Sequence, residues 1–96
     1  MFYTSRDFEN VVIEAIGAWL ENPKNINRWV TAQILHDESR PLSQHKPYLW
    51  PESIRTFGRR MMYRTLDLEG LHGMKKRISH GRNQYMFTKK LAKNVQ

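Results

Sequence analysis

The sequence contains no cysteine among its 96 residues, and this absence excludes three kinds of chemistry together. Disulfides, thiolate metal ligands and cysteine nucleophiles all need that side chain. The chain also lacks an apolar run of the ~18–20 residues that a membrane-spanning helix requires. We therefore expect a cytoplasmic protein with no membrane partner.

Motifs for catalysis and cofactor binding are missing as well. The chain holds no phosphate-binding loop, no dinucleotide fingerprint and no serine-elbow motif. Its four histidines, His36, His45, His72 and His80, lack the short spacing of paired metal ligands. We therefore expect no enzyme activity, no cofactor and no metal site.

Negative charge is scarce in the second half of the chain. Residues 1–53 hold five Lys or Arg against seven Asp or Glu, a net charge of −2, whereas residues 54–96 hold eleven against two, a net charge of +9. Such asymmetry favours a polyanionic partner: nucleic acid first, an acidic membrane or an acidic protein second. The length suits one domain, expected over residues 1–90, followed by a short basic tail at 91–96.

The first predicted helix has apolar side chains at the i, i+3, i+4, i+7 spacing of one buried face. Those side chains are Phe8, Val11, Val12, Ala15, Ile16, Trp19 and Leu20. Thr4 or Ser5 can cap the helix, Asp7 follows Thr4 at capping-box spacing, and Asn22-Pro23 ends it. This helix is also the predicted contact of a homodimer.

A second, short helix of about eight residues is expected after an extended piece at 29–30. Thr31 can cap it, and Ile34 and Leu35 are predicted to face inward. A start at Asn27 would lengthen the helix, and the sequence leaves both starts open.

The segment 39–50 contains two prolines and no periodicity, so it is predicted to be a loop. It is longer than most connections, which indicates a functional or partner-facing role. We expect Leu42, Tyr48, Leu49 and Trp50 to pin it to the core. The same residues form the predicted contact if the partner is a protein.

A basic helix is predicted at about 51–67, opened by Pro51 and stopped by Gly70. One sector of this helix is apolar and the opposite one is rich in arginine. The candidate ligand-contacting residues there are Arg55, Thr56, Arg59, Arg60 and Tyr63, with Arg64 at the margin. Arginine suits bidentate contact with guanine edges or phosphates; the alternative is a solvated cationic face.

A cationic hairpin is predicted at about 71–88, with strands 71–79 and 84–88 joined by a turn at 80–83. Alternation along the strand places Lys75 and Arg77 on one face and Lys76 with Met74 and Ile78 on the other. The candidate contacts on the hairpin are Lys75, Lys76, Arg77, His80, Arg82 and Asn83. The alternative is a charged edge that blocks aggregation.

Residues 62–90, MYRTLDLEGLHGMKKRISHGRNQYMFTKK, resemble the recognition-helix end and wing of bacterial winged helix-turn-helix regulators. The stretch WVTAQIL at 29–35 is similar to the start of their second helix. The resemblance implies a mostly α fold with a small β-hairpin, three helices plus a wing. The chain departs from the pattern at 39–50, where the usual turn is tight.

The function implied by this resemblance is sequence-specific binding of double-stranded DNA by a small, dimeric transcription regulator of bacterial or phage type. The helix at 51–67 would enter the major groove, and the wing would contact the backbone or the minor groove. The alternative is a protein-interaction module that serves a polymerase, a repressor or a nuclease through the 39–50 loop. An anionic membrane surface and RNA also stay open, because phosphate attraction is common to all.

Overall fold

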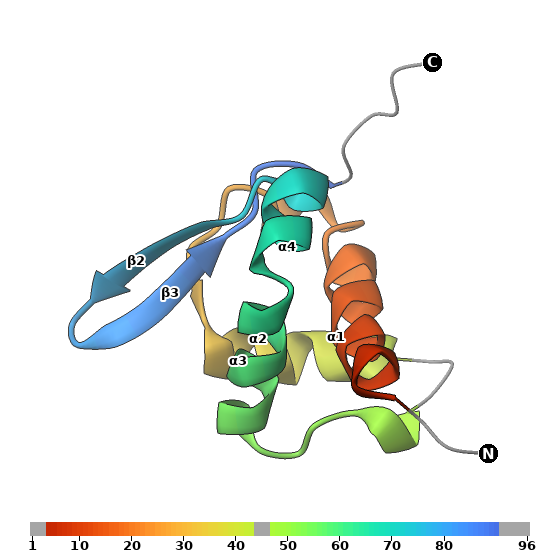
Figure 1. The fold of residues 1–96 in the computed structure, drawn as a ribbon. Helices are drawn as coiled ribbons and strands as arrows, with labels where there is room; N and C mark the ends of the chain where they lie inside the picture. The colour runs from red at the N-terminus through yellow and green to blue at the C-terminus, as the bar shows by residue number, and fades with distance from the viewer. Residues whose placement is uncertain (1–3, 44–46, 91–96) are drawn as a thin grey trace.

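A computed structural model describes residues 4–43 and 47–90 of the chain. Within them lie four α-helices and one antiparallel sheet of three strands (Figure 1). The expectation of a mostly helical chain with a small hairpin is therefore confirmed. In chain order the elements are α1 (Ser5–Trp19), η1 (Pro23–Asn25), β1 (Val30–Thr31), α2 (Ala32–Ser39), η2 (Arg40–Leu42), η3 (Pro47–Leu49), α3 (Ile54–Tyr63), α4 (Thr65–His72), β2 (Lys75–Ser79) and β3 (Arg82–Met86).

The start of α1 is a capping box, as its spacing predicted. The hydroxyl of Thr4 accepts a hydrogen bond from the amide of Asp7 at 3.3 Å, and the Asp7 carboxylate accepts from the amide of Thr4 at 2.8 Å. The apolar face of α1 is buried from Val11 to Leu20. The helix ends at Trp19, shortly before Asn22-Pro23, and Asn22 caps η1 instead.

The predicted cap and length of α2 are confirmed. Thr31 accepts a hydrogen bond from the amide of Ile34, and the helix spans eight residues. Leu35 is fully buried, whereas the side chain of Ile34 is 38% exposed. The inward direction predicted for Ile34 is therefore wrong, because so short a helix buries only the stripe that carries Leu35, His36 and Ser39.

The connection between α2 and α3 is anchored by three of its four predicted side chains. Leu49 and Trp50 are buried, and the Trp50 ring lies 5.5 Å from the rings of both His36 and Phe57. Leu42 is half-buried and packs against the core, as predicted. Tyr48 is 67% exposed, so the prediction that Tyr48 pins the loop to the core is wrong. Residues 44–46 lie outside the described part of the chain.

The single helix predicted at 51–67 is wrong, because the chain forms two helices that break at Arg64. Arg64 has φ −115° and ψ 26°, outside the helical range, and the Thr65 hydroxyl donates to the Met62 carbonyl at 2.8 Å. A side-chain bond of this kind competes with helix continuation. The start also differs: Ser53, and not Pro51, precedes the first helical residue and caps α3.

The predicted stop at Gly70 and strand start at Leu71 are also wrong, because α4 continues to His72. Gly73 then ends the helix in the left-handed conformation, with φ 60°. Glycine reaches this region without the steric cost that a Cβ brings. The first strand of the hairpin begins only at Lys75.

The hairpin turn is tighter than predicted and consists of His80 and Gly81 alone, with φ of 53° and 75°. Two positive φ values are typical of the type I′ turn that joins strands of natural twist. Arg82 and Asn83 therefore belong to β3. β3 pairs with β2 on one side and with β1 on the other, giving the order β1-β3-β2.

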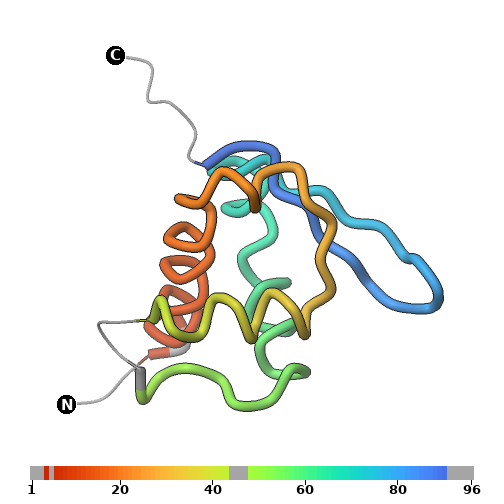
Figure 2. The backbone as a smooth tube through the Cα atoms, turned by 180° about the vertical axis from the view of Figure 1, so that it is seen from behind, coloured from red at the N-terminus to blue at the C-terminus, as the bar shows by residue number. Residues whose placement is uncertain are grey.

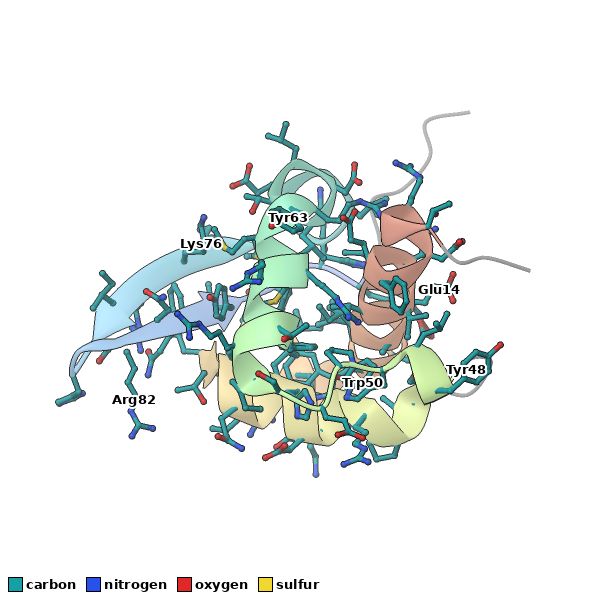
Figure 3. All side chains as sticks on the ribbon, turned by 60° about the horizontal axis from the view of Figure 1, so that its bottom comes forward. Glu14, Tyr48, Trp50, Tyr63, Lys76 and Arg82 are labelled. Atoms are coloured by element: carbon teal, nitrogen blue, oxygen red, sulfur yellow. The ribbon has the colours of Figure 1, made fainter. Side chains whose placement is uncertain are left out.

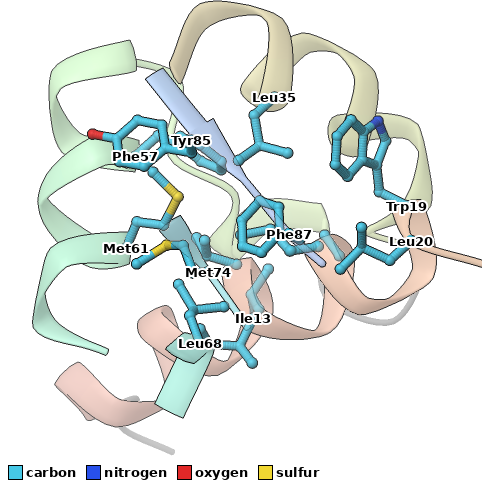
Figure 4. Packing of buried hydrophobic residues seen from close by; sticks show 14 of the residues in the cluster. Ile13, Trp19, Leu20, Leu35, Phe57, Met61, Leu68, Met74, Tyr85 and Phe87 are labelled. Carbon is cyan, nitrogen blue, oxygen red and sulfur yellow. The ribbon is translucent and has the colours of Figure 1, made fainter. Parts of the chain in front are cut away.

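The core fills the space between α1, α2, α3 and the base of the sheet (Figure 4). Its fully buried side chains include Ile16, Leu35, Phe57, Met61 and Phe87. The hairpin projects away from this body, as the tube in Figure 2 shows from behind. The projecting arm leaves its far end accessible to a partner.

Candidate nucleic-acid interface

Some of the predicted contact residues on α3 are accessible to a ligand, and others are bonded to the protein itself. Arg55, Arg59 and Tyr63 are exposed, and Thr56 is half-buried. Arg55 and Arg59 lie one helical turn apart. Within the described residues neither guanidinium makes a hydrogen bond or an ion pair, so both retain their full donor capacity for a ligand.

Arg60 is half-buried and bonded to the protein, and its role as a ligand contact stays a prediction. Its Nη1 donates to the carbonyl oxygen of Leu49 at 3.0 Å, and its guanidinium lies 4.9 Å from the centre of the Phe8 ring. Burial lowers the pKa of the Arg60 guanidinium, and the charge of Glu9 opposes this shift. Arg60 thus ties α3 to the preceding loop.

Arg64 is likewise engaged inside the molecule, so its prediction as a marginal contact is not supported. Its side chain is 12% exposed, and Nη1 donates to the amide oxygen of Asn10 at 2.6 Å. It also forms an ion pair with Asp67, and Glu9 lies 3.9 Å away. The acids close to this arginine come from distant sequence as well as from α4.

The two faces of β2 carry different kinds of side chain. Lys75 and Arg77 share a face, and Arg77 stacks 4.2 Å from the ring centre of Trp29 while its Nε donates to Gln84 at 2.7 Å. Lys76 and Ile78 share the other face. Both are exposed, Ile78 at 75%, and Met74, which is buried, precedes the strand.

The tip of the hairpin presents three polar side chains from the predicted set. His80, Arg82 and Asn83 are exposed, and the His80 ring contacts the Ser79 hydroxyl at 3.1 Å. The guanidinium of Arg82 has no side-chain partner in the described part of the chain. Figure 3 shows Arg82 and Lys76 on the hairpin, far from Tyr48 on the opposite side of the molecule.

A cleft of about 560 Å³ connects the two groups of candidate residues. It lies between α3, β3 and the start of α2, and no carboxylate lines it. Its lining residues are Thr31, Ala32, Gln33, Ile54, Arg55, Gly58, Met62, Arg82, Asn83 and Tyr85. The structure thereby brings Arg55 of α3 and Arg82 of β3 onto one concave surface.

Two other surface clefts contain carboxylates and are less suited to an anion. One, of about 280 Å³, holds Glu9 beside Arg59 and Arg60. The other, of about 790 Å³, holds Glu21 and Glu38. Glu38 accepts from Arg28 at 2.8 Å and from the Trp19 indole at 3.0 Å, and these hydrogen bonds lower the pKa of its carboxyl.

Most residues that line the carboxylate-free cleft were not predicted as ligand contacts, Tyr85 and Gly58 among them. Tyr85 is 4% exposed and belongs to the core, but it also lines the cleft. The available signal was a tyrosine at a buried strand position, where a phenylalanine would pack without a polar atom. The sequence did not indicate that Gly58 lines a cleft, because this depends on which face of α3 lies beside the hairpin.

The structure offers little support for the two predicted protein interfaces, on α1 and on the 39–50 loop. The apolar residues of α1 are used in the core, and its exposed side chains include Glu14 and Ala18. In the 39–50 loop, the buried Leu49 and Trp50 are unavailable to a partner. Dimerisation through α1 and protein binding through the loop stay predictions.

Helices in the described ranges 4–43 and 47–90 are all too short or too polar to cross a membrane. In the same ranges no three His, Asp or Glu side chains gather as a metal site would require. Comparison of the chain with protein-family models, with curated proteins and with solved structures finds no match.

Proposed function

We propose that this chain is a winged-helix protein that binds double-stranded DNA with α3 and the β2–β3 hairpin, as a small transcription regulator. In this arrangement α3 enters the major groove and the hairpin meets the neighbouring backbone or minor groove. Support for the fold comes from the order of elements, helix, strand, helix, helix and hairpin, and from the sheet order β1-β3-β2.

The observation that carries the proposal is a set of exposed cations without acidic partners. In the described residues, Arg55, Arg59, Lys75, Lys76 and Arg82 form no ion pair and no side-chain hydrogen bond. Phosphate contacts by such groups supply most of the affinity of DNA-binding proteins. Arg28 and Arg64, by contrast, form ion pairs with carboxylates.

Fluorescence anisotropy with mixed-sequence duplex DNA across a range of salt concentrations tests the proposal. Binding should be micromolar or tighter at low salt, and log affinity should fall by about 0.9 per phosphate neutralised for each decade of salt. Arg59→Gln should weaken binding. Arg40→Gln, an exposed arginine at the far end of α2, is the matched control and should bind as the wild type does.

Absence of duplex binding at low salt would contradict the proposal, as would equal losses from Arg59→Gln and Arg40→Gln. The hypothesis to test would then be a protein-interaction role, by capture of a polymerase, repressor or nuclease partner. That role predicts capture that survives removal of the exposed cations.

A further inference from the structure

We infer that the cleft between α3, β3 and the start of α2 seats one sugar–phosphate strand of the duplex, with the Tyr85 hydroxyl donating to a phosphate oxygen between Arg55 and Arg82. The inference rests on the proposed function and deepens it. It assigns Arg55 and Tyr85 to the backbone and leaves base reading to other residues of α3, Arg59 first.

The Tyr85 hydroxyl is the first observation that points to a ligand. The residue is 4% exposed and lines the cleft, and its hydroxyl has no hydrogen-bond partner in the described part of the chain. Figure 4 shows its oxygen directed toward α3. The hydroxyl is not among the side-chain atoms that are both buried and unpaired in the described residues, so a group that enters the cleft can reach it and accept its hydrogen bond.

The ionisation of Tyr85 suits that role. Burial raises the pKa of its phenol above the ordinary value of 10.0. The hydroxyl therefore keeps its proton at neutral pH and can donate to an anionic oxygen. A donor that bonds to a charged oxygen forms a stronger hydrogen bond than a neutral pair does.

The charge of the cleft is the second observation. Arg55 and Arg82 reach it from α3 and from β3, and none of its lining residues is acidic. Guanidinium groups bind phosphate in bidentate geometry. The two clefts that contain Glu9 or Glu38 differ in that their cations lie beside carboxylates.

The third argument is that the cleft lies where a DNA strand would pass between α3 and the hairpin. The major and minor grooves are separated by a single sugar–phosphate strand. If α3 occupies one groove and the hairpin the next, that strand must pass between them, which is where the cleft lies. Gly58 lines this passage, and a Cβ built on it meets nothing within 4 Å, so the missing side chain leaves the path open.

Two substitutions test whether the cleft holds a DNA strand and leave the exposed cations unchanged. Tyr85→Phe removes one hydroxyl that has no protein partner, and Gly58→Leu fills the passage from a helical position with free space. Each should weaken duplex binding by about tenfold, equally on all sequences, and leave the urea unfolding midpoint unchanged or raised. Tyr48→Phe and Gly70→Leu are the matched controls and should bind as the wild type does.

The salt dependence separates the two kinds of contact. Arg55→Gln and Arg82→Gln should each reduce the slope of log affinity against log salt by about 0.9, the value for one phosphate. Tyr85→Phe should weaken binding with no change in slope, because it removes no charge. Relaxed sequence preference in Arg55→Gln or Tyr85→Phe would show a base contact and would overturn the inference.

The remaining outcomes distinguish this inference from the proposed function. Wild-type protein that binds duplex while Tyr85→Phe and Gly58→Leu bind equally well would overturn the inference and leave the function standing. Wild-type protein that does not bind duplex would overturn both. Saturable binding of a nucleoside monophosphate, blocked by Tyr85→Phe, would show a pocket for a free phosphate ester and would overturn the assignment to a strand.

Discussion

The guanidinium of Arg64 lies 2.6 Å from the side-chain oxygen of Asn10, although the two residues are 54 positions apart in the chain. This hydrogen bond joins the break between α3 and α4 to the middle of α1. An ion pair with Asp67 holds the same guanidinium from the other side. Arg64 thereby ties the junction between α3 and α4 to α1.

Replacement of Arg64 by glutamine should destabilise the fold by about 1.5–3 kcal/mol, the usual contribution of a hydrogen bond to a charged group. Urea unfolding followed by tryptophan fluorescence measures this change as a lower midpoint with an unaltered slope. Arg59→Gln, at an exposed position on α3, should shift the free energy of unfolding by no more than about 0.5 kcal/mol. Equal stability of the Arg64 variant and the wild type would contradict the assigned role.

Gly73→Ala should be one of the more damaging small substitutions in the chain. Gly73 has φ 60°, and a Cβ placed on it would lie 2.0 Å from the hydroxyl oxygen of Thr88. We expect a loss of more than about 1 kcal/mol, because alanine is strained at positive φ even without a clash. The loss should appear as a lower melting temperature by circular dichroism.

Gly70→Ala is the natural control for that variant. Gly70 lies inside α4, and a Cβ there meets nothing within 4 Å. Alanine should stabilise this position by about 0.5–1 kcal/mol. A destabilised Gly70→Ala with a tolerated Gly73→Ala would show that α4 ends at Gly70, as its sequence alone predicted.

Burial lowers the pKa of His72, which predicts a stability that depends on pH near neutrality. Above about pH 6.5 the ring is neutral in both the folded and the unfolded chain, so the stability is complete. As the pH falls below that value, the unfolded chain binds a proton first, and the free energy of unfolding declines. Hydrogen bonding to the backbone of Lys89 and Lys90 raises the His72 pKa, but the effect of burial is larger.

Urea unfolding between about pH 5 and 8 measures this effect. His72→Gln should flatten the decline, whereas His80→Gln, which alters an exposed turn residue, should retain it. The lowered carboxyl pKa values of Asp37 and Glu38 act at more acidic pH and do not overlap this window. An undiminished decline in the His72 variant would assign the pH dependence to another group.

Much of the fold follows from local rules that a sequence displays. Thr4 and Thr31 cap helices with their own hydroxyls, and the apolar period of residues 8–20 fixes the buried face of α1. The break at Arg64 does not follow, because its partner Asn10 is distant in sequence. At the end of α4 the Gly73 carbonyl accepts a hydrogen bond from the Thr88 hydroxyl, 15 positions further along the chain, which local sequence rules also do not reveal.

The candidate site shows the same division. Charge alone indicated that the second half of the chain faces an anion, and it indicated which segments carry the charge. It did not separate Arg59 from Arg60, since the difference is made by the Leu49 carbonyl and the Phe8 ring, which only the fold places beside Arg60. Tyr85 was not predicted as a ligand contact for a similar reason, because only the fold places it in one cleft with Arg55 and Arg82.

Adjacent arginines on α3 should therefore give opposite results when each is changed to glutamine. Arg59→Gln should reduce duplex affinity by about 1–3 kcal/mol at a cognate site and leave the unfolding midpoint in place. Arg60→Gln should lower that midpoint, because the Leu49 carbonyl loses its donor and Phe8 loses the cation above its ring. Measured at a temperature where both variants are folded, the Arg60 variant should bind duplex nearly as the wild type does. A larger affinity loss for Arg60→Gln than for Arg59→Gln would mean that Arg60 leaves its place on the protein to contact DNA.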